Sequence, residues 1–474
     1  MRTRYPSTFF LLLSLVPAFA VSPMTAPAGV PSADAWLIAE QILEQIEEPV
    51  FPDRDFPVTD FGARDGEDAS SAITAAIAAC HDAGGGRVLI PEGTFVTGPI
   101  HLLSNVNLHL SEGATLLFKE DPAAYLPAVY TRWEGVELFN YSPLIYAFEQ
   151  ENIAITGSGT LDGQATEENW WFMKGQTEHG WREGMPRQHE ARNRLFKMAE
   201  AGVPVAERRF GEGDYLRPPF IQPYRCRNVL IEGVTLLRSP MWQLNPVLCE
   251  NVIVRGITVI SHGPNNDGCN PESSRNVLIE DCLFDTGDDC IAIKSGRNTD
   301  GRRIGVPSEN IIIRNCVMKD GHGGVVIGSE ISGGCRNVFV ENCRMDSPNL
   351  DRAIRVKTNS IRGGLIDGIY VRNIEVGEVA EAVLKVNFHY EEGDGYGFTP
   401  ILRNVLLENV VCRKTRYPVY LVGYEDSPLI NITLRNCVIA GAELPSVIEN
   451  VQELHFENVI FPSTRTVNQW GEVQ

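Results

Sequence analysis

Apolar and polar residues alternate in nine-residue phrases that recur along most of the chain. Each phrase opens on an amide or another polar or small residue, continues with alternating Val, Ile and Leu, and reaches a small or Cys position near its end. Clear copies begin at Asn228, Asn251, Asn276, Asn310, Asn337, Gly368, Asn404 and Asn431, with weaker ones at Asn105 and Asn152. Such alternation predicts short β-strands with one buried face.

The spacing of these phrases predicts how the strands are arranged. Successive starts from Asn228 onward differ by 23, 25, 34, 27, 31, 36 and 27 residues. A repeat of this length fits one coil of a solenoid, in which coils stack about 4.8 Å apart and length differences fall in the turns. We therefore predict an all-β chain folded as a single-stranded, right-handed parallel β-helix.

The N-terminal part of the chain has a different pattern. Residues 33–48 and 70–83 have helical apolar spacing, and three glycines at 84–86 end the second helix. We expect an N-terminal helical cap, a leader and helix over 21–56, and the catalytic β-helix over 57–474. Its first strands are expected at 88–90, 95–96, 106–110 and 115–118.

The first 20 residues have the form of an export signal. Arg2 and Arg4 precede the apolar run Phe9–Ala20, and small residues at 18 and 20 suit cleavage before Val21. We expect a signal peptide over 1–20 and an exported protein, periplasmic or extracellular. No apolar run reaches 18 residues, so no membrane span is expected.

Residues 163–226 form the largest interruption of the repeat. This insertion contains Trp170, Trp171 and Trp181 together with many charged residues. One interpretation is a surface loop packed on itself. The other is a wall over a binding cleft that supplies aromatic faces for a sugar. The sequence leaves both open.

Charge excludes some classes of partner. The formal net charge is −20, and removing residues 1–20 deletes two arginines and no acid, which leaves −22. A chain with this much negative charge is not expected to bind nucleic acid or anionic membranes. An anionic substrate would need local cations.

Several of the eleven cysteines share one position of the repeat. Cys282, Cys316, Cys343 and Cys437 each lie six residues after a phrase start, where other phrases have Val or Ile. That slot is a buried packing position, so inert thiols are expected there rather than a metal or redox site. Among the remaining seven cysteines, one or two disulfides are possible.

Four polar motifs fall in successive units of the repeat. They are N-N-D-G at 265–268, G-D-D-C at 287–290, G-H-G at 321–323 and R-V-K at 355–357. Matching strands that end at Ser273, Ser295, Ser329 and Thr358 set the register between them. In that register Asp267 stacks near Asp289, and Asp288 stacks near His322.

Strand parity places the cations on the same side as the acids. Ile291 and Ile293 point into the core, so Lys294 points outward, and Arg355 and Lys357 align with outward positions. The result is one surface patch with three carboxylates, an imidazole and at least two cations. Each motif alone would fit a solvated turn or strand face, but their convergence indicates a functional site.

The residue types suit the hydrolysis of a glycoside. Inverting hydrolysis needs one protonated carboxylic acid for the leaving oxygen and one carboxylate that activates water. Crowded carboxylates cannot all ionise equally, so one pKa should rise. Arg and Lys suit a substrate that carries a carboxylate.

These motifs resemble those of the polygalacturonases of glycoside hydrolase family 28, which carry N-T-D, G-D-D, G-H-G and R-I-K in this order on a β-helix. The resemblance covers roughly residue 57 to the C-terminus and implies inverting hydrolysis of α-linked galacturonic acid in pectin. It implies that Asp288 is the general acid and that Asp267 and Asp289 activate the water. His322 would support protonation of the acid. Substrate binding would fall to Asn265, Arg355 and Lys357.

The chain departs mildly from the family pattern, with Asn266 in place of Thr and Val356 in place of Ile. Tyr390 could match a substrate-contacting tyrosine of the family. The insertion at 163–226 resembles loops of bacterial exo-acting members, which favours exo action. No cofactor and no metal are expected, and the sequence does not indicate an oligomeric state.

Three other functions stay open. A pectate lyase on a similar β-helix would use the three acids to hold Ca²⁺. A non-catalytic carbohydrate-binding β-helix would not need all three acids. A hydrolase of another pectic linkage, such as those in rhamnogalacturonan, would keep the acids but change the sugar.

Overall fold

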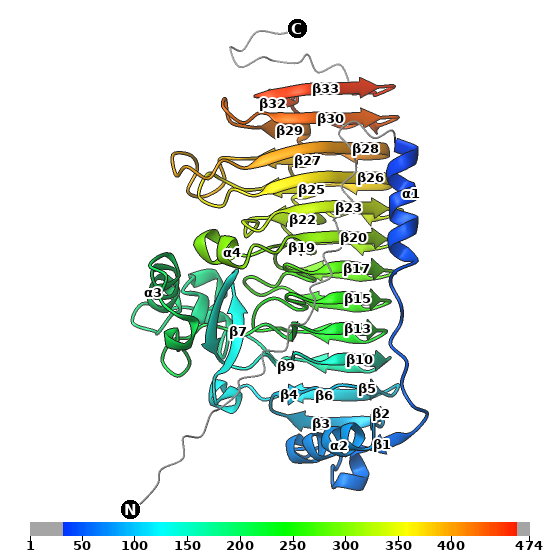
Figure 1. The fold of residues 1–474 in the computed structure, drawn as a ribbon, viewed down its shortest axis with the longest axis vertical. Helices are drawn as coiled ribbons and strands as arrows, with labels where there is room; N and C mark the ends of the chain where they lie inside the picture. Colours follow the sequence, from blue (N-terminus) through cyan, green and yellow to red (C-terminus); the bar gives the residue numbers. More distant parts are fainter. Residues whose placement is uncertain (1–31, 462–474) are drawn as a thin grey trace, which may run out of the picture.

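The computed structural model describes residues 32–461, and within them the chain winds into a right-handed parallel β-helix (Figure 1). The predicted fold class is confirmed. The predicted signal peptide, the leader up to residue 31 and the last 13 residues lie outside the described residues.

Three ladders of parallel strands run the length of the solenoid, and two of them belong to one large sheet. The first ladder consists of β1 (Asp55–Pro57), β2 (Gly86–Ile90), β5 (Val106–Leu110), β10 (Glu151–Gly157), β13 (Arg227–Glu232), β15 (Glu250–Arg255), β17 (Arg275–Glu280), β20 (Ser308–Arg314), β23 (Cys335–Glu341), β26 (Leu365–Glu378), β28 (Ile401–Lys414), β30 (Leu429–Arg435) and β33 (Val451–Glu457). The second consists of β3 (Gly93–Thr97), β6 (Ala114–Phe118), β11 (Thr160–Asp162), β14 (Thr235–Leu237), β16 (Thr258–Ser261), β18 (Leu283–Thr286), β21 (Val317–Met318) and β24 (Arg344–Met345), and it continues through the long β26 and β28 to β31 (Val438–Ile439).

The third ladder carries the outward side chains that matter for function. It consists of β4 (Ile100–His101), β9 (Ile145–Phe148) and β12 (Ile221–Tyr224), then β19 (Ile291–Ile293), β22 (Val325–Gly328), β25 (Arg352–Lys357), β27 (Ala382–Asn387), β29 (Tyr417–Val422) and β32 (Val447–Glu449). Single bridges through Leu244 and Cys269 join its two parts. Because β12 pairs with β9, the predicted insertion already ends near residue 220.

The repeated asparagines have a structural reason. The first residue of each phrase has a positive φ, for example 55° at Asn228 and 59° at Asn251. Asparagine tolerates this left-handed conformation better than most residues with a Cβ atom. Asn228 Nδ2 also donates to Asn152 Oδ1 at 2.8 Å, and Asn251 Nδ2 donates to Asn228 Oδ1 at 2.8 Å. The ladder of amides therefore fixes the register from coil to coil.

The core consists of the inward residues of the three ladders, stacked in rows. Val229, Val252, Val277 and Ile311 occupy one register position and are buried. Cys282, Cys316, Cys343 and Cys437 are buried as predicted, and none of the eleven cysteines, which all lie within residues 32–461, is in a disulfide. Buried thiols thus act as small apolar side chains here.

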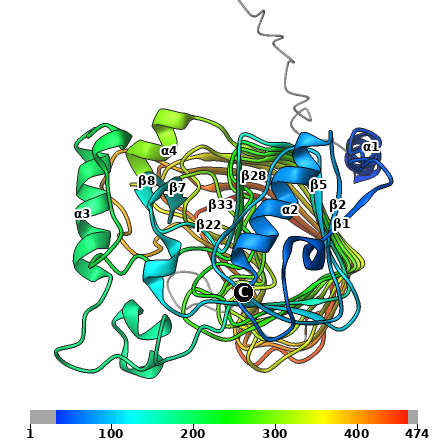
Figure 2. The same ribbon diagram turned by 90° about the horizontal axis from the view of Figure 1, so that it is seen from below.

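Helices cover the first end and one flank of the solenoid (Figures 1 and 2). α2 (Ser70–Asp82) lies over the first coils and buries Ile73, Ile77 and Cys80 in the core. α1 (Ser32–Leu43) lies along the outside of the first ladder, where Trp36 packs against Phe339.

α1 ends at Leu43, five residues before the predicted end at 48. Pro49 disfavours a helical backbone at Glu48. Ile46 lies beyond the end of the helix. It packs against two apolar clusters, the one at α1 and the one on the earlier coils. The apolar periodicity over residues 33–48 therefore reflects one continuous stripe of buried side chains, but only part of that stripe is helical.

Two segments project from the flank opposite α1. One is an antiparallel hairpin of β7 (Val129–Trp133) and β8 (Val136–Asn140), which the sequence pattern did not predict. The other is the insertion, with α3 (His189–Glu200) and the short helices η3 (Trp171–Lys174), η4 (Thr177–His179) and η5 (Val205–Glu207). Figure 2 shows α3 beside α4 (Asn298–Ile304) on this flank.

Candidate active site

The strand pairing reproduces the predicted register of the four motifs. Cys269 pairs with Ile291, and Ile291 pairs with Val325, so Ser273, Ser295 and Ser329 align. Val326 pairs with Arg355, so the R-V-K strand continues the same rows. Residues that are 22 to 34 positions apart in the sequence therefore become neighbours across single coils.

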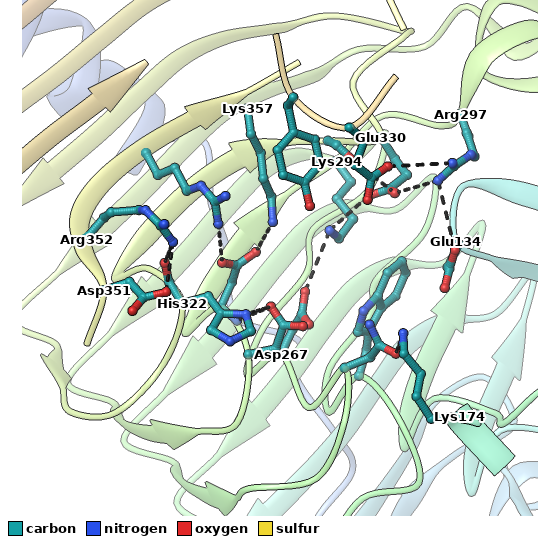
Figure 3. Close-up of a pocket in the computed structure, with 18 of the residues that line it drawn as sticks. Glu134, Lys174, Asp267, Lys294, Arg297, His322, Glu330, Asp351, Arg352 and Lys357 are labelled. Atoms are coloured by element: carbon teal, nitrogen blue, oxygen red, sulfur yellow. Dashed lines mark hydrogen bonds and ion pairs between the residues drawn. The ribbon is translucent and has the colours of Figure 1, made fainter. Parts of the chain in front are cut away.

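The polar residues of these coils line one cavity of about 390 Å³ (Figure 3). All eight residues expected from the sequence contribute to its wall: Asn265, Asp267, Asp288, Asp289, His322, Arg355, Lys357 and Tyr390. The other lining residues are Glu134, Lys174, Arg192, Trp242, Lys294, Arg297, Ser329, Glu330, Asp351, Arg352 and Glu391.

Asp267, Asp288 and Asp289 form the centre of the cavity. One carboxylate oxygen from each lies within 4.8 Å of the other two. Asp267 and Asp289 are buried, and Asp288 is partly exposed. Three acids so close together cannot all ionise at equal pH, which makes the cluster a store for at least one proton.

Asp288 and His322 form an ion pair, with Nδ1 of His322 3.0 Å from Oδ1 of Asp288. Burial raises the pKa of Asp288, but the hydrogen bond and charge of His322 outweigh it and hold that pKa below its usual range. In return, the hydrogen bond to Asp288 raises the pKa of His322 to about 9. At neutral pH the pair therefore holds one proton, which resides on the imidazole.

Asp267 has the opposite environment. Burial raises the pKa of Asp267 to about 8, and the negative charge of Asp288 adds to the effect. Asn270 Nδ2 donates to Oδ2 of Asp267 at 2.8 Å, and Nζ of Lys294 lies 3.7 Å from the same oxygen. Burial and the charge of Asp288 thus favour the protonated form of Asp267.

Cations neutralise Asp289. Nζ of Lys357 donates to Oδ2 of Asp289 at 2.7 Å, and Nη1 of Arg355 lies 3.8 Å from Oδ1. The ring of Tyr390 faces both cations, 5.4 Å from Cζ of Arg355 and 5.5 Å from Nζ of Lys357. Arg355 and Lys357 therefore lie between the acids and an aromatic ring that a sugar could contact.

The spacing of the three acids would also suit a metal ion. These acids already have partners, however, because Asp267 lies beside Lys294, Asp288 pairs with His322 and Asp289 pairs with Lys357. A divalent cation would have to displace a buried lysine and an imidazolium from this cluster. The electrostatics thus favour acid–base chemistry.

The rest of the cavity comes from segments that sequence reasoning did not connect to the site. Glu134 comes from the β7–β8 hairpin, Lys174 and Arg192 come from the insertion, and Arg297 and Glu330 come from turns after the third ladder. Nη1 of Arg297 lies 3.2 Å from Oε1 of Glu330 and 3.9 Å from Oε2 of Glu134. Among the residues that line this region, only Lys294 could be placed from the repeat, because strand alternation predicts that it points outward.

The insertion does form one wall of the cavity, but not with aromatic faces. Trp170 is buried in the core, Trp171 donates to the backbone oxygen of Ser239, and Trp181 faces Arg187. The tryptophan that lines the cavity is Trp242, with Nζ of Lys294 4.7 Å from its ring centroid. Of the two interpretations that the sequence left open, the structure favours a wall over the cleft, but one lined by Lys174 and Arg192 and not by aromatic faces.

Residues 211–459 match the profile of the glycosyl hydrolases family 28, and the chain belongs to that family. It is similar to the hyperthermoactive exopolygalacturonase of Thermotoga maritima, with 49% identity, a TM-score of 0.87, and coverage of 90% of this chain and 96% of that one.

Two curated relatives are also similar over most of the chain. The exo-poly-alpha-D-galacturonosidase of Dickeya chrysanthemi is 28% identical over 455 residues, which is 86% of this chain and 71% of the relative. A probable polygalacturonase of Vitis vinifera is 28% identical over 368 residues, which is 75% of this chain and 67% of the relative. No helix among residues 32–461 is long and apolar enough to span a membrane.

Proposed function

We propose that this protein is an exported polygalacturonase, which hydrolyses α-linked galacturonic acid in pectin from a chain end and inverts the anomeric configuration. The observation that carries the proposal is the cluster of Asp267, Asp288 and Asp289 beside two cations in one cavity. The 49% identity to an exopolygalacturonase supports the substrate.

In this proposal Asp288 donates the proton that the leaving glycosidic oxygen needs. The His322–Asp288 pair holds that proton on Nδ1 of the imidazole, 3.0 Å from the carboxylate. As charge develops on the leaving oxygen, His322 passes its Nδ1 proton to Asp288, and Asp288 passes a proton on to that oxygen. His322 is then neutral until the next proton arrives from solvent.

Asp289 and Asp267 act on the water from the other side. Asp289 is a carboxylate paired with Lys357, so it accepts a proton as the water attacks the anomeric carbon. Protonated Asp267 orients the same water. The three oxygens lie closer than the 6.5–9.5 Å separation usual for inverting enzymes, so inversion rests here on the family motifs rather than on spacing.

The β7–β8 hairpin covers the end of the cavity on the N-terminal side of the acids. This covered end supports action at a chain end. Val129 and Tyr130 of the hairpin pack against Tyr146, Tyr224 and Val247, which are outward residues of the third ladder on the N-terminal side of the acids. A polymer cannot run across that covered face. On the other side, Lys385 and Tyr420 continue the row of Arg355 and remain partly exposed.

Export is part of the proposal because Arg2 and Arg4 precede the apolar run Phe9–Ala20. A polymer the size of pectin has to be met outside the cell. Finding the chain in the periplasm or medium, with its N-terminus at Val21, would support this part.

The test is incubation with polygalacturonate in the presence of a calcium chelator. We expect new reducing ends, no ultraviolet absorbance from unsaturated product, and one short product from the earliest times. Absorbance that disappears with the chelator would instead indicate a lyase. No cleavage of polygalacturonate, with cleavage of rhamnogalacturonan fragments, would move the function to that linkage, and binding without any cleavage would indicate a binding module.

A further inference from the structure

We propose that Lys174 binds the carboxylate of the terminal sugar in the covered end of the cavity, so that the enzyme selects chains that end in a uronic acid. This inference rests on the proposed function and names a specificity-determining residue for it. Lys174 lies outside the four motifs, in the insertion.

The insertion holds Lys174 in a fixed position. Lys174 is the last residue of η3, and the helix ends at Gly175, which has a φ of 84°. The preceding residues are anchored: Trp170 is fully buried, Met173 is buried, and Nε1 of Trp171 donates to the backbone oxygen of Ser239 at 2.9 Å. The backbone of Lys174 is thus held in place, and the hydrogen bond to Asn265 sets where its ammonium group lies.

Among the described residues, the ammonium group of Lys174 has no carboxylate partner. Its Nζ donates to Oδ1 of Asn265 at 2.7 Å, and none of the ion pairs within residues 32–461 includes Lys174. Arg217 Nη2 donates to the same Asn265 oxygen at 2.9 Å, so a neutral amide serves two cations. An ammonium group has three donors, which leaves two for a ligand.

The other cations of the cavity are paired, which makes Lys174 different. Their carboxylate partners are Glu134 for Arg192, Glu330 for Lys294 and Arg297, Asp289 for Lys357 and Arg355, and Asp351 for Arg352. These pairs leave the positive charge of Lys174 uncompensated. Burial lowers the pKa of Lys174. The positive charges of Arg217 and Arg192 lower it further, whereas the negative charge of Glu134 raises it.

A second cavity of about 290 Å³ lies behind Lys174. Lys174 and Arg192 line both cavities, and the second one also has Gly175, Gln176, Arg187, Gln188 and His189 in its wall but no acidic residue. The insertion therefore forms a cationic partition. A carboxylate bound at Lys174 would supply the charge that the partition lacks.

Lys174 lies where the terminal sugar would bind, on the opposite side of the cleaved bond from the leaving group. Figure 3 shows Lys174, Glu134 and Arg297 on one side of Asp267, with His322, Asp351 and Arg352 on the other. Arg355 and Lys357 are next to Asp289. Two separate cationic groups thus flank the acids, one for each of two adjoining uronic acids.

The test compares trigalacturonate with two singly methyl-esterified forms, one at each terminal sugar. In the wild-type enzyme, the ester at the end that enters the covered pocket should lower kcat/KM about 10- to 100-fold, the loss expected for one charge-assisted hydrogen bond. Lys174→Gln should lower kcat/KM for the free acid by a similar factor and reduce that discrimination to less than about 3-fold. Lys174→Arg should keep it.

Arg187→Gln is the matched control, because Arg187 lines only the cavity behind the partition. We expect it to keep the wild-type discrimination, and thermal unfolding should show that all variants fold. Full discrimination in Lys174→Gln, with an active wild-type enzyme, would overturn the inference alone. A wild-type enzyme inactive on all three trisaccharides would overturn the proposed function and the inference with it.

Discussion

Nδ1 of His322 lies 3.0 Å from Oδ1 of Asp288, although the two residues are 34 positions apart and belong to successive coils. The pair keeps a proton next to a carboxylate that is ionised and could not donate by itself. It thereby separates two tasks. His322 stores the proton at neutral pH, and Asp288 delivers it at the moment of bond cleavage.

Replacing Asp288 is the simplest test of this arrangement. Asp288→Asn should lower kcat by about 10²- to 10⁴-fold, the usual contribution of a general acid, because an amide cannot donate an equivalent proton. The melting temperature should change little, since the side chain keeps its shape. The rate of reducing-end formation measures the effect.

Asp285→Asn is its matched control. Oδ1 of Asp285 lies 2.9 Å from Nε2 of His262, which is an Asp–His pair of the same kind outside the cavity. We expect near-normal kcat in this variant. Equal losses in the two variants would show that the Asp288 effect is structural and not catalytic.

The stability contribution of His322 should depend on pH. Its folded-state pKa is raised from 6.5 to about 9, so its stabilisation is complete below about pH 6.5 and is lost as pH rises through 9. Asp288 has a lowered pKa, so its share is present above its unfolded pKa near 3.9 and is lost at lower pH.

The melting temperature of His322→Asn relative to the wild type should therefore differ most between about pH 4 and 6.5 and converge above pH 9. Because the His322 side chain is 54% exposed, we expect no more than about 1 kcal/mol. His262→Asn is the control. A difference that grows as the pH rises above about 6.5 would contradict the ion pair.

Lys357 should be important for stability as well as binding. Lys357 and Asp289 are both buried, and removing one partner of a buried pair typically costs about 3–5 kcal/mol because the other charge stays unpaired. Only the more distant Arg355 would remain beside Asp289, so Lys357→Met should lower the free energy of unfolding by up to about that amount, which chemical denaturation can measure.

Adding Asp289→Asn to Lys357→Met should recover much of that stability while activity stays lost, because the unpaired charge is gone but so is the base. If the double variant is as unstable as the sum of the two single variants, the pair does not interact as described.

The cysteines should behave as buried thiols. All eleven are free and buried, and burial raises the pKa of thiols such as Cys412 to about 12 and Cys80 to about 11. In the native protein a thiol reagent should therefore react with almost none of them, whereas denaturation without a reductant should expose all eleven. Fewer reactive thiols after denaturation would show that disulfides have formed.

The strand pattern predicted that the central acids would lie together, because their positions are fixed by the repeat. Each motif lies at a set distance from a strand end, and strands of neighbouring coils pair in one register, since a slip of one residue would turn the apolar side chains outward. Asp267, Asp288, His322 and Lys357 could thus be placed together from residue counting alone.

The covered end of the cavity could not be predicted in this way. Glu134 lies on a hairpin that pairs with itself, and Lys174 and Arg192 lie in the insertion, so no register relates them to the acids. Their positions depend on tertiary contacts, such as Arg208 Nη1 with Asp300 Oδ1 at 2.8 Å, which joins the insertion to α4. Charged residues on both segments gave no signal that they would meet.

The most direct test of the mechanism is the anomeric form of the first product. Proton NMR during cleavage of polygalacturonate should show β-galacturonate first, because inversion of an α-linkage gives the β-anomer, followed by slow conversion to the equilibrium mixture. Initial appearance of the α-anomer would contradict the roles given to Asp267 and Asp289. It would show that one of these closely spaced acids attacks the sugar itself.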